Sequence, residues 1–130
     1  MPKDLKRLSR TEWTIMQICW KLGRATARQV HEASDGRRDY RTVKTLLDRI
    51  AAKGFLRIEK LGRLSLFVPA VTRQRALSEV ITDFVDDVLE RSVTPLYLHL
   101  AERDDLSPEE VAFFRRQLDA DEEAAEEEER

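Results

Sequence analysis

A helix-capping signal occurs three times before residue 54 of this chain, and it constrains the fold more than any other feature. Ser9 and Glu12 have the spacing of a capping box, in which side chain and backbone at a helix start hydrogen-bond reciprocally. Thr26 and Gln29 repeat that spacing, and Asp39 can cap a third helix. Three helices in about 45 residues, the last two joined by a short loop, are typical of a helix-turn-helix.

Apolar residues follow the first and third caps at helical spacing. In both segments they occur at i, i+3, i+4 and i+7, which places them on one face of a helix. Gly23 and Gly54 end the two segments, as glycine commonly does at a helix C-terminus. The predicted inward positions are Ile15, Ile18, Cys19 and Leu22 in the first helix and Val43, Leu46, Leu47 and Ile50 in the third.

After Gly54 the period of the pattern changes to that of a strand. Leu56 and Ile58 alternate with charged residues, and a second apolar run from Leu64 is interrupted by Phe67 before Pro69 ends it. A glycine-bearing connection around Gly62 joins the two runs, as in a hairpin. The fold class predicted is mainly α with a small two-stranded β wing: a winged helix-turn-helix followed by a C-terminal helical dimerisation arm.

The residues after Thr72 return to a helical pattern, in one segment of about 21 residues and two shorter ones. Their apolar stripe could cover the winged domain as ordinary core. A two-fold dimer is the preferred interpretation, because the helical segments that follow the wing offer too few partners within one chain to bury so many large apolar residues. The predicted dimer interface is Leu77, Val80, Ile81, Phe84, Val85, Val88, Leu89, Leu96, Leu100, Phe114 and Leu118.

Charge divides the chain into two halves. Residues 1–71 carry 16 Lys+Arg against 7 Asp+Glu, a net +9, whereas residues 72–130 carry 7 against 18, a net −11. This division indicates an N-terminal half that binds a polyanion. Mutual attraction of the two halves is the alternative. The predicted domains are 1–71 for DNA binding, 72–119 for dimerisation, and an acidic, disordered tail over 120–130.

The face of the third helix opposite to its apolar residues is basic and hydroxyl-bearing. Arginine and lysine can pair with guanine edges in the major groove, and threonine offers a methyl group to thymine. A solvated polar face is the alternative, since most helices have one. The predicted base-reading residues are Arg41, Thr42, Lys44, Thr45 and Arg49.

Further cations lie where phosphates could be bound. A glycine at a hairpin tip lets the backbone approach a phosphate, and a helix N-terminus attracts anions. The predicted phosphate contacts are Arg24 and Arg28 at the second helix, Arg37 and Arg38 before the third, and Lys60, Gly62 and Arg63 in the wing.

Catalysis has little support in the sequence. His31 and His99 lack the spacing of a metal motif, and Cys19 is a single cysteine interpreted as core. We find no phosphate loop or nucleophile elbow, and we expect no catalytic residue, metal or cofactor. Without a membrane span or signal sequence, a soluble, intracellular protein is expected.

The order of these parts resembles the BlaI/MecI penicillinase-repressor family of bacterial transcriptional regulators over about residues 6 to 118. The resemblance is carried by 8–13 through Met16 and Trp20, Thr26-Ala27 with Val30, the Thr-Val-x-Thr-Leu-Leu-x-Arg run of 42–49, Lys53-Gly54 and Gly62-Arg63. It implies a homodimeric winged-helix repressor of a dyad-symmetric DNA operator, with 41, 42, 44 and 45 on the reading helix. The location it implies is the bacterial cytoplasm, in association with the nucleoid.

The chain also departs from that family. Members relieved by proteolysis are cut at an Asn-Phe bond, where this chain has His99-Leu100, and copper-responsive relatives carry C-terminal Cys-x-Cys motifs that it lacks. The resemblance therefore does not identify the inducing signal, and an unknown inducer or protease is a possible partner. Two other functions remain in view: a winged-helix module that binds an acidic protein surface, and a ligand-sensing winged-helix regulator of another family.

Overall fold

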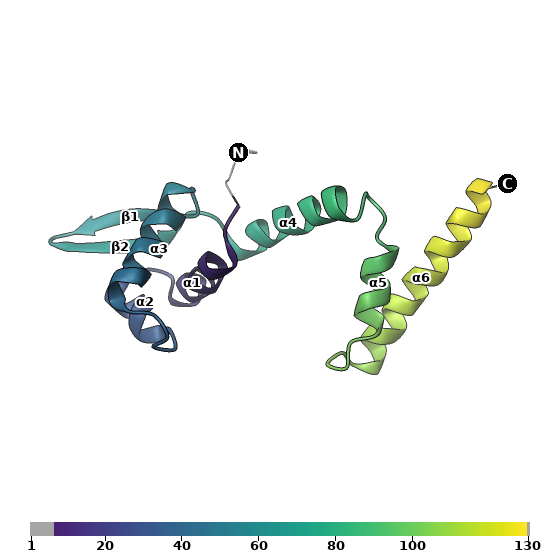
Figure 1. Cartoon of the computed structure of the whole chain (residues 1–130), viewed down its shortest axis with the longest axis horizontal. Helices are drawn as coiled ribbons and strands as arrows, with labels where there is room; N and C mark the ends of the chain where they lie inside the picture. The colour runs from purple at the N-terminus through teal and green to yellow at the C-terminus, as the bar shows by residue number, and fades with distance from the viewer. Residues whose placement is uncertain (1–6, 130) are drawn as a thin grey trace. The chain divides into compact units, whose positions relative to one another are not determined.

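The computed structural model describes residues 7–129 and divides the chain into two compact units, one ending at Leu77 and one beginning at Ser78 (Figure 1). The structure is mostly helical with one two-stranded antiparallel sheet, which confirms the predicted fold class. The elements of the first unit are α1 (Arg10–Leu22), α2 (Ala27–Ala33), α3 (Tyr40–Ala52), β1 (Leu56–Leu61), β2 (Leu64–Pro69) and the start of α4 (Arg73–Asp83).

The three predicted caps are present. Ser9 Oγ accepts a hydrogen bond from the Glu12 backbone N–H at 3.1 Å, and the Glu12 carboxylate accepts one from the Ser9 N–H at 2.7 Å. Thr26 and Gln29 form the same reciprocal pair at the start of α2. Asp39 Oδ1 accepts from the Thr42 N–H at 2.8 Å and so fixes the start of α3. These bonds satisfy backbone donors that a helix cannot satisfy internally.

The core of the first unit forms where α1, α2 and α3 meet. All four inward positions predicted for α3 are buried, as are Ile15 and Cys19 of α1. Leu22, by contrast, the last residue of α1, is 43% exposed. The buried cluster is Leu8, Ile15, Met16, Cys19, Ala25, Ala27, Val30, Val43, Leu46, Leu47, Ile50, Phe55, Leu56, Phe67, Val71 and Ala76.

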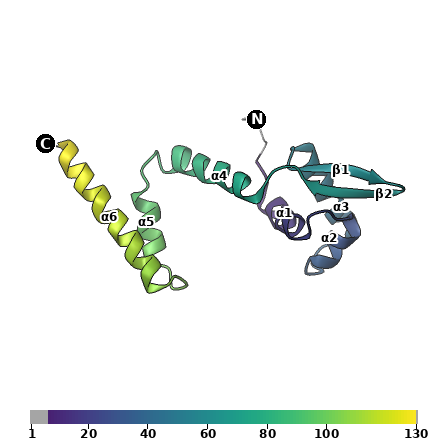
Figure 2. The same cartoon turned by 180° about the vertical axis from the view of Figure 1, so that it is seen from behind.

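The wing pairs β1 with β2 in antiparallel register, from Leu56 opposite Pro69 to Leu61 opposite Leu64 (Figure 2). Phe67, which breaks the alternation in the sequence, is the buried residue of β2, while its partner Ile58 is 45% exposed. The cause is a backbone bridge in which Ala25 and Phe67 exchange two N–H···O bonds of 2.7 and 3.2 Å. This bridge holds Phe67 against the helices.

A buried ion pair joins α1 to the end of α3. Lys53 Nζ donates a hydrogen bond to Glu12 Oε1, and Glu12 is buried to 2% exposure. Burial raises the pKa of the Glu12 carboxyl, but hydrogen bonds from Lys53 and Ser9 lower it by more, so its pKa lies below the ordinary 4.5. Glu12 therefore serves both as a helix cap and as the partner of Lys53.

The first unit extends beyond the predicted boundary at residue 71. Trp20 Nε1 donates to the Val71 carbonyl at 3.0 Å, and Arg73 Nε donates to Gln17 Oε1 at 3.1 Å. Ala76 is buried in the same core. The first turns of α4 therefore belong to the winged unit.

The helix predicted as one segment after Thr72 is interrupted, which corrects that expectation. α4 ends at Asp83 and passes into a π-helical turn, η1 (Phe84–Val88), in which the Leu89 N–H donates to the Phe84 carbonyl at 3.0 Å. Glu90 and Arg91 then adopt positive φ values of 51° and 68°. Left-handed backbone at two non-glycine residues ends the helix.

The second unit continues with α5 (Thr94–Ala101) and α6 (Pro108–Glu129), which pack side by side (Figures 1 and 2). The rings of Tyr97 and Phe114 stack with centroids 6.2 Å apart, and Thr94 Oγ1 donates to Asp121 at 3.4 Å. The tail predicted to be disordered from residue 120 instead continues α6 to Glu129. Glutamate and alanine are strong helix formers, and in the structure this preference outweighs the repulsion among the carboxylates.

The Glu12–Lys53 pair predicts an acid-sensitive part of the stability. Because the folded-state pKa of Glu12 is lowered, its contribution is complete above the unfolded value of 4.5 and is lost as the pH falls through the folded-state pKa. Glu12→Gln should lower the free energy of unfolding at pH 7 by about 1–3 kcal/mol and flatten its dependence on pH in this window. Denaturant titrations at pH 3–7 measure both effects.

Glu110→Gln is the matched control, since Glu110 occupies the same position in an exposed capping box with Ser107. It should change the stability far less. Identical pH profiles for wild type and Glu12→Gln would contradict the assignment.

Candidate nucleic-acid interface

The exposed face of α3 follows from the burial of its opposite face. Val43, Leu46, Leu47 and Ile50 lie in the core, so the remaining positions of the helix face away from it. Four of the predicted base-reading residues are exposed there: Arg41, Thr42, Thr45 and Arg49.

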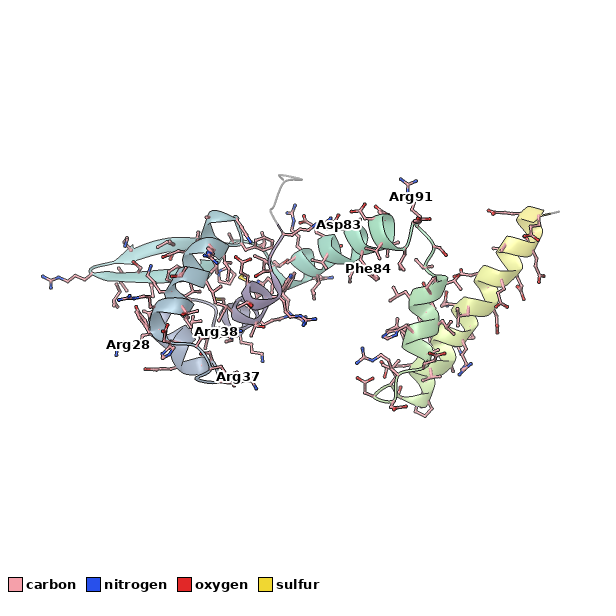
Figure 3. The ribbon with its side chains drawn as sticks, in the orientation of Figure 1. Arg28, Arg37, Arg38, Asp83, Phe84 and Arg91 are labelled. Atoms are coloured by element: carbon pink, nitrogen blue, oxygen red, sulfur yellow. The ribbon has the colours of Figure 1, made fainter. Side chains whose placement is uncertain are left out.

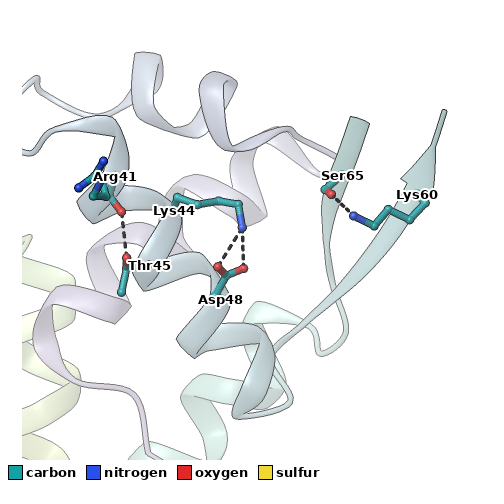
Figure 4. Close-up of polar contacts among 6 residues, drawn as sticks. All are labelled: Arg41, Lys44, Thr45, Asp48, Lys60 and Ser65. Atoms are coloured by element: carbon teal, nitrogen blue, oxygen red, sulfur yellow. Dashed lines mark hydrogen bonds and ion pairs between the residues drawn. The ribbon is translucent and has the colours of Figure 1, made fainter. Parts of the chain in front are cut away.

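The start of this face is held by local hydrogen bonds. Thr45 Oγ1 donates to the Arg41 carbonyl at 3.0 Å, one turn back along α3 (Figure 4). The hydrogen bonds that Asp39 accepts from the Thr42 backbone N–H and hydroxyl lower the pKa of its carboxyl, and the nearby charge of Arg41 lowers it further. Asp39 therefore stays ionised at neutral pH.

Lys44 differs from the other residues of the predicted reading set. Its Nζ lies 2.9 and 3.0 Å from the two carboxylate oxygens of Asp48 (Figure 4). The same Nζ lies 5.5 Å from the centre of the Phe67 ring. The ammonium is thus partly neutralised on the side of α3 that faces β2. Arg41 and Arg49 form no ion pair within residues 7–129. Sequence reasoning missed Asp48 as a partner, although the i, i+4 spacing of Lys44 and Asp48 is a signal for such a pair.

The wing presents cations beside apolar residues. Lys60 Nζ donates to Ser65 Oγ at 2.6 Å across the hairpin (Figure 4), and Gly62 takes a φ of 62° at the tip. A positive φ there favours glycine over any other residue. Leu61 and Leu64, at 64% and 54% exposed, flank this tip.

The remaining predicted phosphate contacts fall into two groups. Arg24 pairs with Glu59 of β1 at 2.9 Å, a partner that sequence reasoning missed because it comes from a distant segment. Arg28 lies near the start of α2, and Arg37 and Arg38 lie in the loop between α2 and α3 (Figure 3). These three side chains form no ion pair within the described part of the chain.

The predicted dimer residues differ in exposure. Leu77 is half-buried in the first unit. In the second unit Val85, Leu89, Leu96, Leu100, Phe114 and Leu118 are half-buried. Val80, Ile81, Phe84 and Val88 are between 43% and 65% exposed, and they form an apolar stripe over α4 and η1; Phe84 is labelled in Figure 3.

Two observations bear on metal binding and on thiol reactivity. No group of three or more His, Cys, Asp or Glu among residues 7–129 could hold a metal ion. Burial raises the pKa of the Cys19 thiol to about 12, so the side chain is an inert part of the core. No helix within the same residues is long and apolar enough to cross a membrane.

A helix-turn-helix with an attached wing and an exposed cationic helix face defines the class: a winged-helix, DNA-binding transcription regulator. The penicillinase repressor family model matches residues 8–120, and the chain belongs to that family. The family is one of transcriptional repressors rather than enzymes.

The chain is also similar to individual proteins, two of which are named as a regulator or a repressor. The chain is 27% identical to the methicillin resistance regulatory protein MecI of Mammaliicoccus sciuri, over 91% of this chain and 98% of that protein. It is 23% identical to the penicillinase repressor of Bacillus licheniformis, over 84% and 87%. An uncharacterized 16.5 kDa protein of Latilactobacillus sakei is 33% identical, over 59% of this chain and 54% of that relative's length.

The Lys44–Asp48 pair yields a prediction about charge on the reading face. Asp48→Asn removes a negative charge and releases the Lys44 ammonium, so affinity for duplex DNA should rise about 3- to 10-fold at low salt. Fluorescence anisotropy with a labelled duplex measures the change. In a Lys44→Ala background the same substitution should give a smaller gain, since only the general charge effect remains. An equal gain in both backgrounds would show that the pair does not restrain Lys44.

Proposed function

We propose that the protein is a homodimeric repressor that binds a dyad-symmetric operator, with α3 of each protomer in a major groove and the wing on flanking phosphates. The observation that carries the proposal is the exposed run Arg41, Thr42, Thr45 and Arg49, backed by a fully buried opposite face. A helix supported in this way can enter the groove without losing core contacts. Family membership supports the same reading.

Within this proposal the cations have different tasks. Arg41 and Arg49, which form no ion pair within residues 7–129, are assigned to base edges, together with the threonine methyl groups. Arg28 and Arg63 are assigned to the phosphate backbone, as is the Gly62 backbone at the wing tip. Arg24 and Lys60, already bonded to Glu59 and Ser65, are assigned to secondary phosphate contacts.

Removing a base contact and removing a phosphate contact should have different effects. Arg41→Ala should weaken operator binding by about 1–3 kcal/mol and relax base preference at one position of each half-site. Arg63→Ala should instead weaken binding to all sequences and reduce the dependence of affinity on salt. The purified protein is first used to select genomic fragments that it retains. The affinity of each variant for these fragments, measured at two salt concentrations, separates the two effects.

Arg116→Ala on α6 is a suitable control, because it removes the same charge from the second unit. If Arg41→Ala and Lys44→Ala each leave the operator affinity unchanged, α3 is not the reading helix. An absence of duplex binding even at low salt would reject the DNA-binding role of this face.

The apolar stripe of α4 and η1 supports the dimer. Val80, Ile81, Phe84 and Val88 are too exposed for a stable isolated surface, and a second copy related by a two-fold axis would cover them with an identical stripe. Two recognition helices could then contact half-sites about one DNA turn apart.

Charged residues within the stripe should therefore give monomers. Phe84→Glu with Val88→Glu should shift the mass measured by sedimentation equilibrium to that of one chain and weaken operator binding at least tenfold. Glu79→Gln, on the same helix and outside the stripe, should leave the dimer intact. A wild-type protein that is monomeric at micromolar concentration would refute the dimer.

A further inference from the structure

A cleft in the first unit lies outside the surface assigned to operator bases. It has a volume of about 450 Å³ and is formed between α1 and the loop that joins α2 to α3. None of its described lining residues comes from α3 or from the wing. They are Thr14, Gln17, Ile18, Lys21, Ala33, Ser34, Asp35, Arg37 and Arg38.

The charge around this cleft is positive. Lys21, Arg37 and Arg38 contribute three cations, and Asp35 is the single acidic residue among the residues that line it. None of the three cations forms an ion pair with Asp35 or with any other residue between 7 and 129. Cations gathered at a concave surface raise the local potential and attract anions.

One neutral side chain of the cleft can donate to an anion. Gln17 Oε1 accepts from Arg73 Nε, and the side-chain NH₂ of Gln17, which can only donate, makes no hydrogen bond within residues 7–129. The hydroxyls of Thr14 and Ser34 donate their protons to backbone carbonyls, so both can only accept. The free donors of the lining are therefore those of Gln17 and of the three cations, whose natural partners are phosphate and carboxylate oxygens.

We propose that this cleft binds a small molecule carrying a phosphate or carboxylate group, held by Lys21, Arg37 and Arg38 with Gln17 as an additional donor. The volume admits a small metabolite-sized ligand. The sequence assigns Arg37 and Arg38 to phosphates of the DNA backbone, which share this chemistry. Lys21, on α1, distinguishes the two sources because it belongs to the cleft and not to the proposed DNA-binding residues.

The position of the cleft would allow a bound ligand to change the affinity of the protein for its operator. Arg38 directly precedes Asp39, the cap of α3, and its carbonyl lies 3.2 Å from His31 Nε2, which donates to it. Gln17 is bonded to Arg73 at the start of α4. A bound anion would thus contact residues that hold the start of the reading helix and the start of the arm, so binding at the two sites would be coupled.

The test uses the full-length protein without DNA and inorganic phosphate as the probe. Phosphate is titrated at constant ionic strength, with chloride as the balancing ion, while backbone amide signals are followed by NMR. We expect saturable shifts centred on residues 14–21 and 33–38 that extend to the neighbouring Asp39 and Arg73 and leave the wing and α6 unchanged. Lys21→Gln and Arg38→Gln should each weaken phosphate binding about tenfold, as expected for the loss of a charge-assisted hydrogen bond. Arg116→Gln, the same charge change on α6, should have no effect.

Two results would overturn the proposal. One is a set of shifts that is absent, non-saturable or spread over all cationic surfaces. The other combines two observations: the wild type does not bind phosphate, and DNA affinity is lost in Arg37→Gln and Arg38→Gln but not in Lys21→Gln. The two arginines would then contact only the DNA backbone. The phosphate titration is performed without DNA, so its result does not depend on operator binding. The two proposals can therefore be rejected independently.

Discussion

The packing of one face of α3 into the core is the constraint on which the rest of the first unit depends. Val43, Leu46, Leu47 and Ile50 are buried against α1, α2 and the base of the wing. Since a helix has two sides, this burial determines which residues remain available to a ligand. The Asp39 cap fixes one end of α3, and Lys53 bonded to Glu12 fixes the other. The exposed face of α3 is thus held in place by groups that are not part of it.

Local patterns in the sequence are sufficient for the helices of this unit. The Ser9, Thr26 and Asp39 caps act over three residues, and the apolar spacing acts over seven, so both can be read without knowledge of the fold. Burial in the wing is different. Phe67 rather than Ile58 is covered because Ala25, from a distant segment, bridges to β2. Such a contact between distant segments produces no periodic pattern in the sequence of either segment.

The difference between local patterns and contacts of distant segments also explains which ion pairs of the candidate interface could be predicted from the sequence. The exposed positions of α3 follow from periodicity, and the pairing of Lys44 with Asp48 could have been inferred from their spacing. The pairing of Arg24 with Glu59 requires knowing that β1 passes beside the loop between α1 and α2. The break at Glu90 and Arg91 was also beyond pattern analysis, because neither residue type favours left-handed backbone.

The burial of the single cysteine has a practical consequence for spectroscopy. The Cys19 thiol, with a pKa of about 12 and 1% exposure, has almost no thiolate at neutral pH and no access to reagents. A cysteine placed by mutation on an exposed helix would therefore be alkylated selectively in the native protein, without first replacing Cys19. Spin labels or fluorophores could be attached in this way to α3 or α6, and the distances between the two units could be followed in solution.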